Sequence, residues 1–237
     1  ADPGKVILPP YYPDHPELRQ DWAKYLDSWV ETDKEVGSIL TDLKIAGRLG
    51  STAVFLWTDH GVSHLRGKQF LYEEGIRVPM IIRLPGKQRA GTVRDDLIEH
   101  IDVAACSLEL AGIRIPDNVQ GRDFLDPNYK FREFIFAGRD RCDETVDILR
   151  CVRDSRYKYV RNFMSHVPHA QPNQYKDGKK IVQVIHGLHK KGKLNDQQAL
   201  PFALRRPPEE LYDLQNDPHE LVNLAVMPKH QKKLAAM

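Results

Sequence analysis

Residues 53–79 read AVFLWTDHGVSHLRGKQFLYEEGIRVP, and this stretch decides both the fold and where a site is sought. It opens with five apolar residues, 53–57, without polar alternation, a pattern typical of a strand covered on both faces as in a parallel sheet. Asp59 and His60 follow where that strand stops, and Gly61 comes next. Ligands of open α/β sheets bind beyond the carboxyl ends of the strands, so these side chains are predicted to lie at a binding edge.

Asp59 and His60 admit two interpretations. A carboxylate beside an imidazole can hold a divalent cation, and Lys68, eight residues after His60, adds a mobile positive charge, so that together they describe a site for an anion. Asp-His-Gly after a strand is also typical of a plain turn, in which Asp59 caps its own backbone and Gly61 adopts positive φ. The motif is short, and spacing alone does not separate the two.

Composition bounds the function classes. The 237 residues have a hydrophobic fraction of 41% and a mean hydropathy of -0.52, which indicates a soluble but rather polar chain. The net charge of +2 is too balanced for a nucleic-acid binder, whose basic residues gather in a patch. No apolar run approaches the roughly 18 residues that cross a bilayer. The cysteines, an odd number without a Cys-x-x-Cys pair, predict neither a disulfide framework nor a zinc site: Cys106, Cys142 and Cys151.

The residues before this stretch predict an extended segment and one helix. Five prolines within residues 1–16 favour an extended connector. From Trp22 to Leu43 apolar residues recur every three or four positions, which indicates an amphipathic helix ending near Gly47. A helix followed by a strand is half of a βαβ unit, so an earlier parallel strand is expected. No candidate for it precedes Trp22, which suggests a fold whose amino-terminal part is missing.

The residues after the stretch predict short elements. Residues 78–84 form a second strand, and residues 102–111 a short helix with Asp102 as its N-cap and Gly112 beyond its end. Residues 149–152 and 157–160 read as a hairpin of a small antiparallel subdomain. His64, in the loop between the first two strands, is either a donor to a substrate oxygen or a surface histidine.

A charged cluster follows the apolar run 134–137. Residues 138–144 read GRDRCDE, and Arg139, Arg141 and Asp143 are candidates for binding a sulfated sugar, because arginine forks bind oxyanions bidentately. The alternative is a self-compensated network of surface salt bridges without a function.

These motifs, in this order and spacing, resemble the second half of a sulfatase of the alkaline-phosphatase superfamily. The resemblance rests on the Asp59 to Gly61 motif, the Gly-Lys pair ending at Lys68, the segments 72–79 and 81–86, and the carboxyl-terminal runs 207–214 and 216–225. The run 139–144 resembles a segment of the branch related to arylsulfatases and heparan N-sulfatases, which favours the sugar pocket over the salt-bridge network.

The resemblance implies a role for each matching residue. Asp59 and His60 correspond to metal ligands, and Lys68 to the residue that contacts the sulfate. The implied cofactor is a divalent metal, Ca²⁺ first, with Mg²⁺ or Mn²⁺ as alternatives. Many members have Asn where this chain has His60, and because calcium prefers oxygen ligands this departure leaves the metal open.

The family nucleophile, a formylglycine made in a Cys/Ser-x-Pro-x-Arg motif, is absent from this chain, since no cysteine or serine has that context. The paired aspartates that supply the other metal ligands also have no matching segment before Trp22. We therefore expect this polypeptide to be inactive alone. The fold class expected is α/β: part of a doubly wound mixed or parallel sheet with flanking helices at residues 1–137, then a small antiparallel α+β subdomain at 138–237.

Three functional hypotheses remain. The first is a fragment of a metal-dependent sulfuric ester or sulfamate hydrolase acting on a sulfated carbohydrate or aryl sulfate, with Lys68 and His64 catalytic. The second is a phosphomonoesterase or phosphodiesterase of the same superfamily, and the third a noncatalytic glycan-binding remnant. The resemblance favours an extracytoplasmic location, without a membrane span or a nucleic-acid partner.

Overall fold

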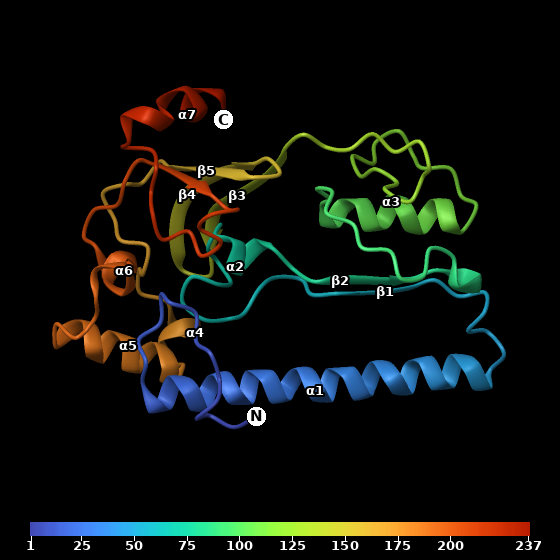
Figure 1. Ribbon diagram of the computed structural model, residues 1–237, viewed down its shortest axis with the longest axis horizontal. Helices are drawn as coiled ribbons and strands as arrows, with labels where there is room; N and C mark the ends of the chain where they lie inside the picture. The colour runs from blue at the N-terminus through green and yellow to red at the C-terminus, as the bar shows by residue number, and fades with distance from the viewer.

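The computed structural model describes all residues from 1 to 237 (Figure 1). Its α-helices are α1 (Pro16–Ile45), α2 (Glu73–Ile76), α3 (His100–Leu110), α4 (Gln174–Asp177), α5 (Lys180–Lys190), α6 (Asp196–Ala199) and α7 (Gln231–Ala236). Its strands are β1 (Val54–Trp57), β2 (Met80–Arg83), β3 (Ile135–Cys142), β4 (Thr145–Arg153), β5 (Tyr157–Asn162) and β6 (Glu209–Asp213). Short 3-10 turns lie at Pro85–Lys87, Leu200–Phe202 and Pro228–His230.

Helix α1 is the longest element and starts earlier than the sequence predicts. The His15 side chain caps it by accepting a hydrogen bond from Glu17 N at 3.2 Å, and Pro16 occupies the first turn. Proline fits there because its missing N–H has no partner within the helix and its φ is already helical, so Pro16 opens α1 rather than preventing it. The predicted end is confirmed, since Gly47, with φ of 67°, follows the last turn.

Strands β1 and β2 form a separate two-stranded sheet. They pair antiparallel, with Val54 opposite Arg83 and Trp57 opposite Met80. The prediction that this strand is covered on both faces is wrong for the structure: Val54 to Leu56 are half-buried and Trp57 is 40% exposed. The reason is that β2 is the only strand beside β1, and the two form a ribbon rather than the centre of a wide sheet. The α/β class itself is confirmed.

The second sheet has four strands in the order β3-β4-β5-β6, each antiparallel to its neighbour. The predicted hairpin is confirmed as β4 and β5, with Val152 opposite Tyr159. The sheet begins at Ile135, close to the predicted boundary at residue 137. Buried side chains from both sides of that boundary pack together, so the division into domains stays a prediction.

Helix α3 shows a correction at its start. It runs from His100 rather than 102, and its N-cap is Glu99 instead of Asp102. Asp102 is the third residue of a capping box and accepts a hydrogen bond from Glu99 N at 2.8 Å. Its other oxygen accepts from Arg122 N at 2.8 Å, so a buried carboxylate ties the loop after α3 to the helix start.

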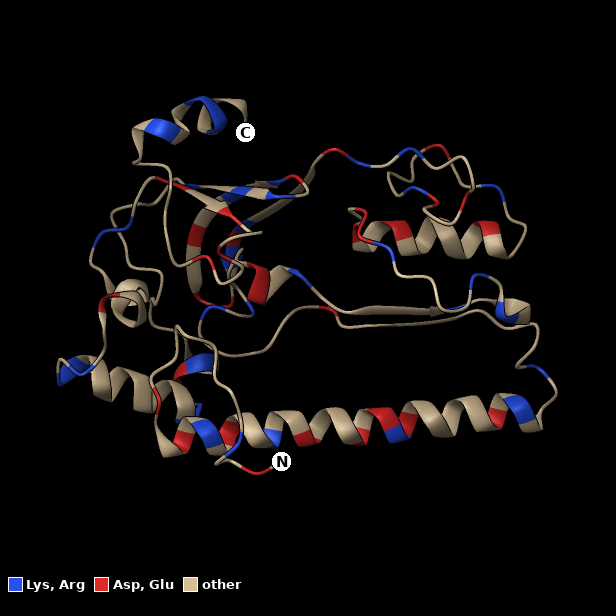
Figure 2. Ribbon diagram, in the orientation of Figure 1, with Lys and Arg blue, Asp and Glu red and all other residues tan.

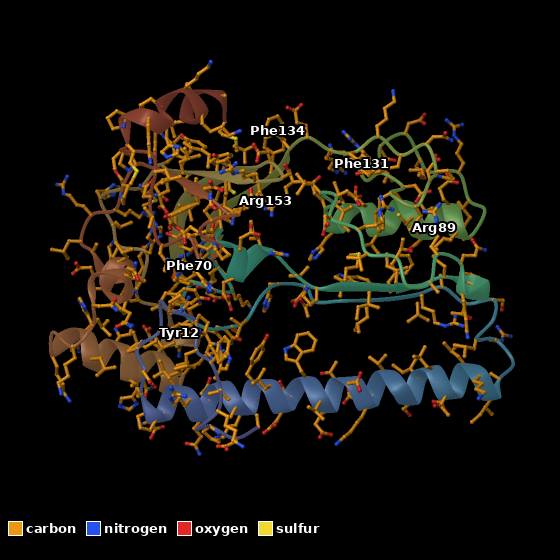
Figure 3. All side chains as sticks on the ribbon, viewed as in Figure 1. Tyr12, Phe70, Arg89, Phe131, Phe134 and Arg153 are labelled. Carbon is orange, nitrogen blue, oxygen red and sulfur yellow. The ribbon has the colours of Figure 1, made fainter.

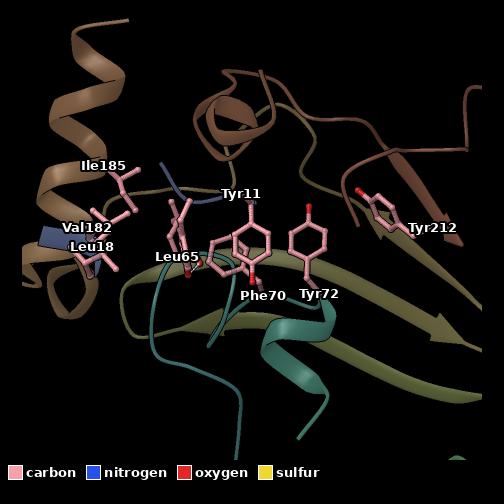
Figure 4. Packing of buried hydrophobic residues seen from close by; sticks show 10 residues of the cluster. Tyr11, Leu18, Leu65, Phe70, Tyr72, Val182, Ile185 and Tyr212 are labelled. Atoms are coloured by element: carbon pink, nitrogen blue, oxygen red, sulfur yellow. Dashed lines mark hydrogen bonds between the residues drawn. The ribbon is translucent and has the colours of Figure 1, made fainter. Parts of the chain in front are cut away.

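The main core joins four segments that are far apart in sequence (Figure 4). Leu18 of α1 packs with the face of α5 that carries Ile181, Val182 and Ile185. The same cluster holds aromatic side chains from the segment before α1, from the residues after β1 and from β6: Tyr11, Tyr12, Phe70, Tyr72 and Tyr212. The segment after β1 is thereby anchored against the carboxyl-terminal half of the chain.

The remainder of α1, the β1–β2 ribbon and α3 form an arm that leaves this core (Figure 1). The only buried residues of α1, Leu18 and Ala23, lie in its first turns. Large apolar side chains are exposed along the arm: Val30, Ile39, Ile45, Trp57, Ile81, Val93 and Phe131. Figure 3 shows these elements with their side chains, and Phe131 lies in the loop after α3. None of the helices has the length and apolar character to cross a bilayer.

Candidate functional site

The residues after β1 line a cavity of about 640 Å³. One wall is the continuous stretch from Thr58 to His64, which starts where the strand ends. The other walls come from α1, from α2 with the residues after it, and from the carboxyl-terminal run: Tyr25, Trp29, Glu74, Arg77, Pro79, His219 and Glu220. The predicted binding edge therefore coincides with a cavity in the structure.

Asp59 and His60 place their potential metal-binding atoms close to one another in this cavity. His60 Nδ1 donates to Gly61 O at 2.7 Å, which leaves the lone pair on Nε2, and Nε2 lies 3.5 Å from Asp59 Oδ2. Two ligands about 2.4 Å from one ion and about 90° apart are separated by roughly 3.4 Å, so this pair has the spacing of neighbouring ligands. No third His, Cys, Asp or Glu joins them, and the residues of this chain do not complete a metal site on their own.

Gly61 is required by packing and not by a turn. Its φ is not among the positive values, as a simple Asp-His-Gly turn would need. A Cβ at Gly61 would lie 1.7 Å from Glu74 O, and Gly61 N donates to Gly75 O at 3.0 Å. Close contact with α2 thus holds the backbone beside Asp59 and His60 in place, and the plain-turn interpretation loses its main support.

His64 is buried and oriented by a residue that sequence reasoning missed. Its Nε2 lies 2.6 Å from Asp21 Oδ2 on α1, and because a carboxylate only accepts, Nε2 carries the proton. Burial lowers the His64 pKa despite the opposing effect of Asp21, so the ring is neutral with a free lone pair on Nδ1. The surface-histidine interpretation is wrong, since His64 is only 8% exposed. Nothing in the sequence marked Asp21, which is one acidic residue among many on α1.

Lys68 lies beside the cavity and not in its lining. Its Nζ sits 5.0 Å from the centre of the Tyr175 ring and forms no ion pair. Ser63, which does line the cavity, connects the two places because its Oγ lies 3.0 Å from Tyr175 OH. The structure brings Asp59, His60 and His64 onto one cavity and sets Lys68 in an adjacent cluster of cations.

The charged run 138–144 braces the backbone next to Lys68. Arg139 is buried and donates to Gln69 O at 2.7 Å, and Asp143 Oδ2 accepts from Gln69 Nε2 at 3.1 Å. Arg141 is exposed and donates to Asp143 O at 2.7 Å. Arg139 therefore positions the segment that carries Lys68, and the sugar-binding roles of Arg139, Arg141 and Asp143 stay predictions.

A buried ion cluster fixes α2, which in turn holds Gly61. Lys158 of β5 is fully buried and its Nζ lies 2.9 Å from Glu73 Oε1 and 2.8 Å from Glu220 Oε1. Glu220 Oε2 also accepts from Glu73 N at 2.6 Å, and Arg153 pairs with Glu73 at 3.1 Å. Arg153 is labelled in Figure 3, whereas Arg77, which follows α2, lines the cavity without an ion pair.

Comparison with known proteins places these features in a family. A family model named Sulfatase matches residues 8–113. An ulvan-active sulfatase of Formosa agariphila is 37% identical over 234 residues, which cover 98% of this chain and 39% of the relative. The N-sulphoglucosamine sulphohydrolase of Homo sapiens is 24% identical over 98% of this chain and 49% of its own length.

A solved structure gives the same result for the fold. The structure of a 2-O GAG sulfatase aligns with a TM-score of 0.68 at 24% identity and covers 95% of this chain and 43% of that one. This chain therefore spans less than half the length of these relatives. The motif order, the fold and these similarities agree: the chain belongs to the sulfatase family of the alkaline-phosphatase superfamily.

Proposed function

We propose that this chain forms part of a metal-dependent hydrolase that removes sulfate from a sulfated carbohydrate, as a sulfuric ester or a sulfamate. The observation that carries the proposal is the stretch 59–68, which sets a carboxylate and two imidazoles in one cavity and an unpaired ammonium beside it. Membership of the sulfatase family supports the same conclusion. The nucleophile is proposed to lie outside these residues.

Asp59 and His60 are proposed as two ligands of a divalent cation, with Ca²⁺ as the first candidate and Mg²⁺ or Mn²⁺ as alternatives. The 3.5 Å separation of Nε2 and Oδ2 suits neighbouring ligands, and the hydrogen bond from Nδ1 to Gly61 O presents Nε2 to a cation. Such a cation supplies charge neutralisation of sulfate oxygens. The other ligands must come from elsewhere in the protein, since this chain offers no third group.

Lys68 and His64 are proposed as the catalytic residues of this chain. The Lys68 ammonium has no carboxylate to neutralise it, so its charge is available to sulfate oxygens as the S–O or S–N bond breaks. Asp21 takes the hydrogen of His64 Nε2, so His64 is not free to act as the donor that the sequence predicts and offers the lone pair of Nδ1 as an acceptor instead. Arg141 and Asp143 are proposed to contact the sugar. We further propose, from the family alone, an extracytoplasmic location.

The test of the reaction class compares 4-nitrophenyl sulfate with 4-nitrophenyl phosphate on the intact protein that contains this chain. A sulfatase gives a higher kcat/KM for the sulfate ester. A higher value for the phosphate ester would assign the protein to the phosphoesterases of the superfamily, and no turnover of either would favour a glycan-binding role.

The metal assignment has its own test. Asp59→Ala in the intact protein is expected to lose the bound divalent metal, because one of two ligands from this chain is removed. Elemental analysis after dialysis measures the loss, and Asp117→Ala, at a similarly exposed aspartate, serves as the control. Equal metal content in both variants would remove Asp59 from the ligand set.

A further inference from the structure

Three lysines converge next to the cavity without any acidic partner. Lys68 and Lys179 hold their Nζ atoms 5.0 Å and 4.6 Å from the centre of the same Tyr175 ring. Lys176 lies beneath them, buried, with its Nζ donating to His64 O at 3.1 Å and to Lys68 O. No carboxylate lies within 4.0 Å of any of the three ammonium groups, although the rest of the chain is rich in ion pairs. Figure 2 shows how the basic residues (blue) and the acidic residues (red) are distributed along the whole chain.

The cluster keeps a free donor on Lys179. The Lys179 ammonium gives two of its three hydrogens to Ser63, to the carbonyl oxygen at 2.8 Å and to Oγ at 3.0 Å. The third hydrogen has no acceptor within the chain. Tyr175 OH, 3.0 Å from Ser63 Oγ, adds a hydroxyl beside it, and Tyr175 itself is 47% exposed. An incoming oxyanion can therefore reach Lys179 and Tyr175 from solvent.

The pKa shifts within the cluster are also consistent with a site for an anion. Burial and the neighbouring cations Arg139, Lys179 and Lys68 lower the Lys176 pKa to about 7. The hydrogen bond with Ser63, together with Lys179 and Lys68, lowers the Tyr175 pKa. At Lys176 the neighbouring cations add to the effect of burial, and at Tyr175 they add to the effect of the Ser63 hydrogen bond.

We propose that Lys179 and Tyr175 form a subsite for a second sulfate group of the substrate, next to the sulfate that Lys68 contacts. The inference rests on the proposed function, and it deepens that function by defining the substrate class as sugars carrying two sulfates. Ser63 links the two places, because it lines the cavity and binds both Lys179 and Tyr175. Ammonium and hydroxyl donors are the groups that bind sulfate oxygens, and a charge-assisted bond is stronger than a neutral one.

The experiment measures binding of two probes, glucosamine 6-O-sulfate and glucosamine N,6-O-disulfate, by calorimetry on the intact protein. The unmodified protein is expected to bind the disulfate about tenfold more tightly than the monosulfate, the effect of one charge-assisted hydrogen bond. Lys179→Met is expected to remove this preference and to leave the monosulfate affinity within about twofold. The matched control is Lys180→Met at the exposed neighbouring residue, which makes no side-chain contact with Ser63 and should retain the preference.

Two outcomes overturn the subsite. One is an unmodified protein that binds both probes equally, and the other is a disulfate preference that survives Lys179→Met. Lys68→Met distinguishes failure of the subsite from failure of the proposed function, because this variant should lower the affinity for both probes by the same factor. If Lys68→Met leaves both affinities unchanged while Lys179→Met removes the preference, the role proposed for Lys68 fails and the subsite stands.

Discussion

The two ends of the molecule differ in how completely their side chains are paired or buried. In the four-stranded sheet, buried charges are paired, and Lys158 binds Glu73 and Glu220 with no exposure to solvent. In the arm, apolar side chains are left uncovered, and Ile81 of β2 is 65% exposed. The candidate site lies between these regions: the sheet holds it through α2 and Gly61, and α1 contributes Asp21 as the partner of His64. The strand before Asp59 and His60, β1, belongs to the arm itself and is only half-buried.

The largest effect is expected at the buried charge cluster. Lys158→Met leaves Glu73 and Glu220 buried with one cation fewer, which should lower the free energy of unfolding by about 3–5 kcal/mol. Hydrogen exchange of the β5 amides reports the change. The control Arg161→Met on the same strand removes an ion pair with Glu209 that is about 40% exposed and should cost at most about 1 kcal/mol. Equal effects would mean that the cluster does not anchor the sheet.

A second effect concerns acid stability of the same sheet. Burial by itself raises the Glu210 pKa, but hydrogen bonds from His169, Tyr212 and Asn162 outweigh it and lower the pKa to about 2. The unfolded carboxyl titrates near 4.5, so the stabilisation is complete above that pH and is lost as the pH falls toward 2.

The measurement is urea unfolding at pH 7 and pH 3. The free energy of unfolding should fall from pH 7 to pH 3 in the unmodified protein, and in Glu210→Gln this fall should be smaller by about 2 kcal/mol. Glu209→Gln, at a more exposed neighbour on β6, should keep the loss of the unmodified protein. If Glu210→Gln leaves the pH dependence unaltered, the carboxylate is not the group that senses acid.

The smallest effect is expected in the arm. Ile81→Ala should change the free energy of unfolding by no more than about 0.5 kcal/mol, since the side chain is 65% exposed. Leu149→Ala in β4, where the side chain is 2% exposed, should cost about 2–5 kcal/mol. Urea unfolding followed by circular dichroism compares the two. A large cost at Ile81 would show that the ribbon is a packed part of the fold.

Local patterns in the sequence predicted the positions of helices and strands better than the pairing between strands. The hairpin of β4 and β5, the end of α1 at Gly47 and the strand before Asp59 all follow from apolar spacing and turn residues. The antiparallel pairing of β1 with β2 was missed, because an unbroken apolar run does not state which strand lies beside it.

The site shows the same limit. Asp59 and His60 were identified from their place after a strand, and the cavity there agrees. Asp21 and Tyr175 carry no local signal, because each acts on a residue more than 40 positions away. Lys179 has a second lysine, Lys180, beside it in the sequence, and only the structure distinguishes the one that binds Ser63 from its exposed neighbour.

The central claim is that Lys68, an unpaired cation at this edge, acts on the sulfate group. Its direct test is the turnover of 4-nitrophenyl sulfate by Lys68→Ala in the intact protein, with Lys180→Ala as control. The account predicts that kcat falls on the order of 100-fold or more for Lys68→Ala, while the fold and the control are unaffected. A kcat close to that of the unmodified protein would contradict it.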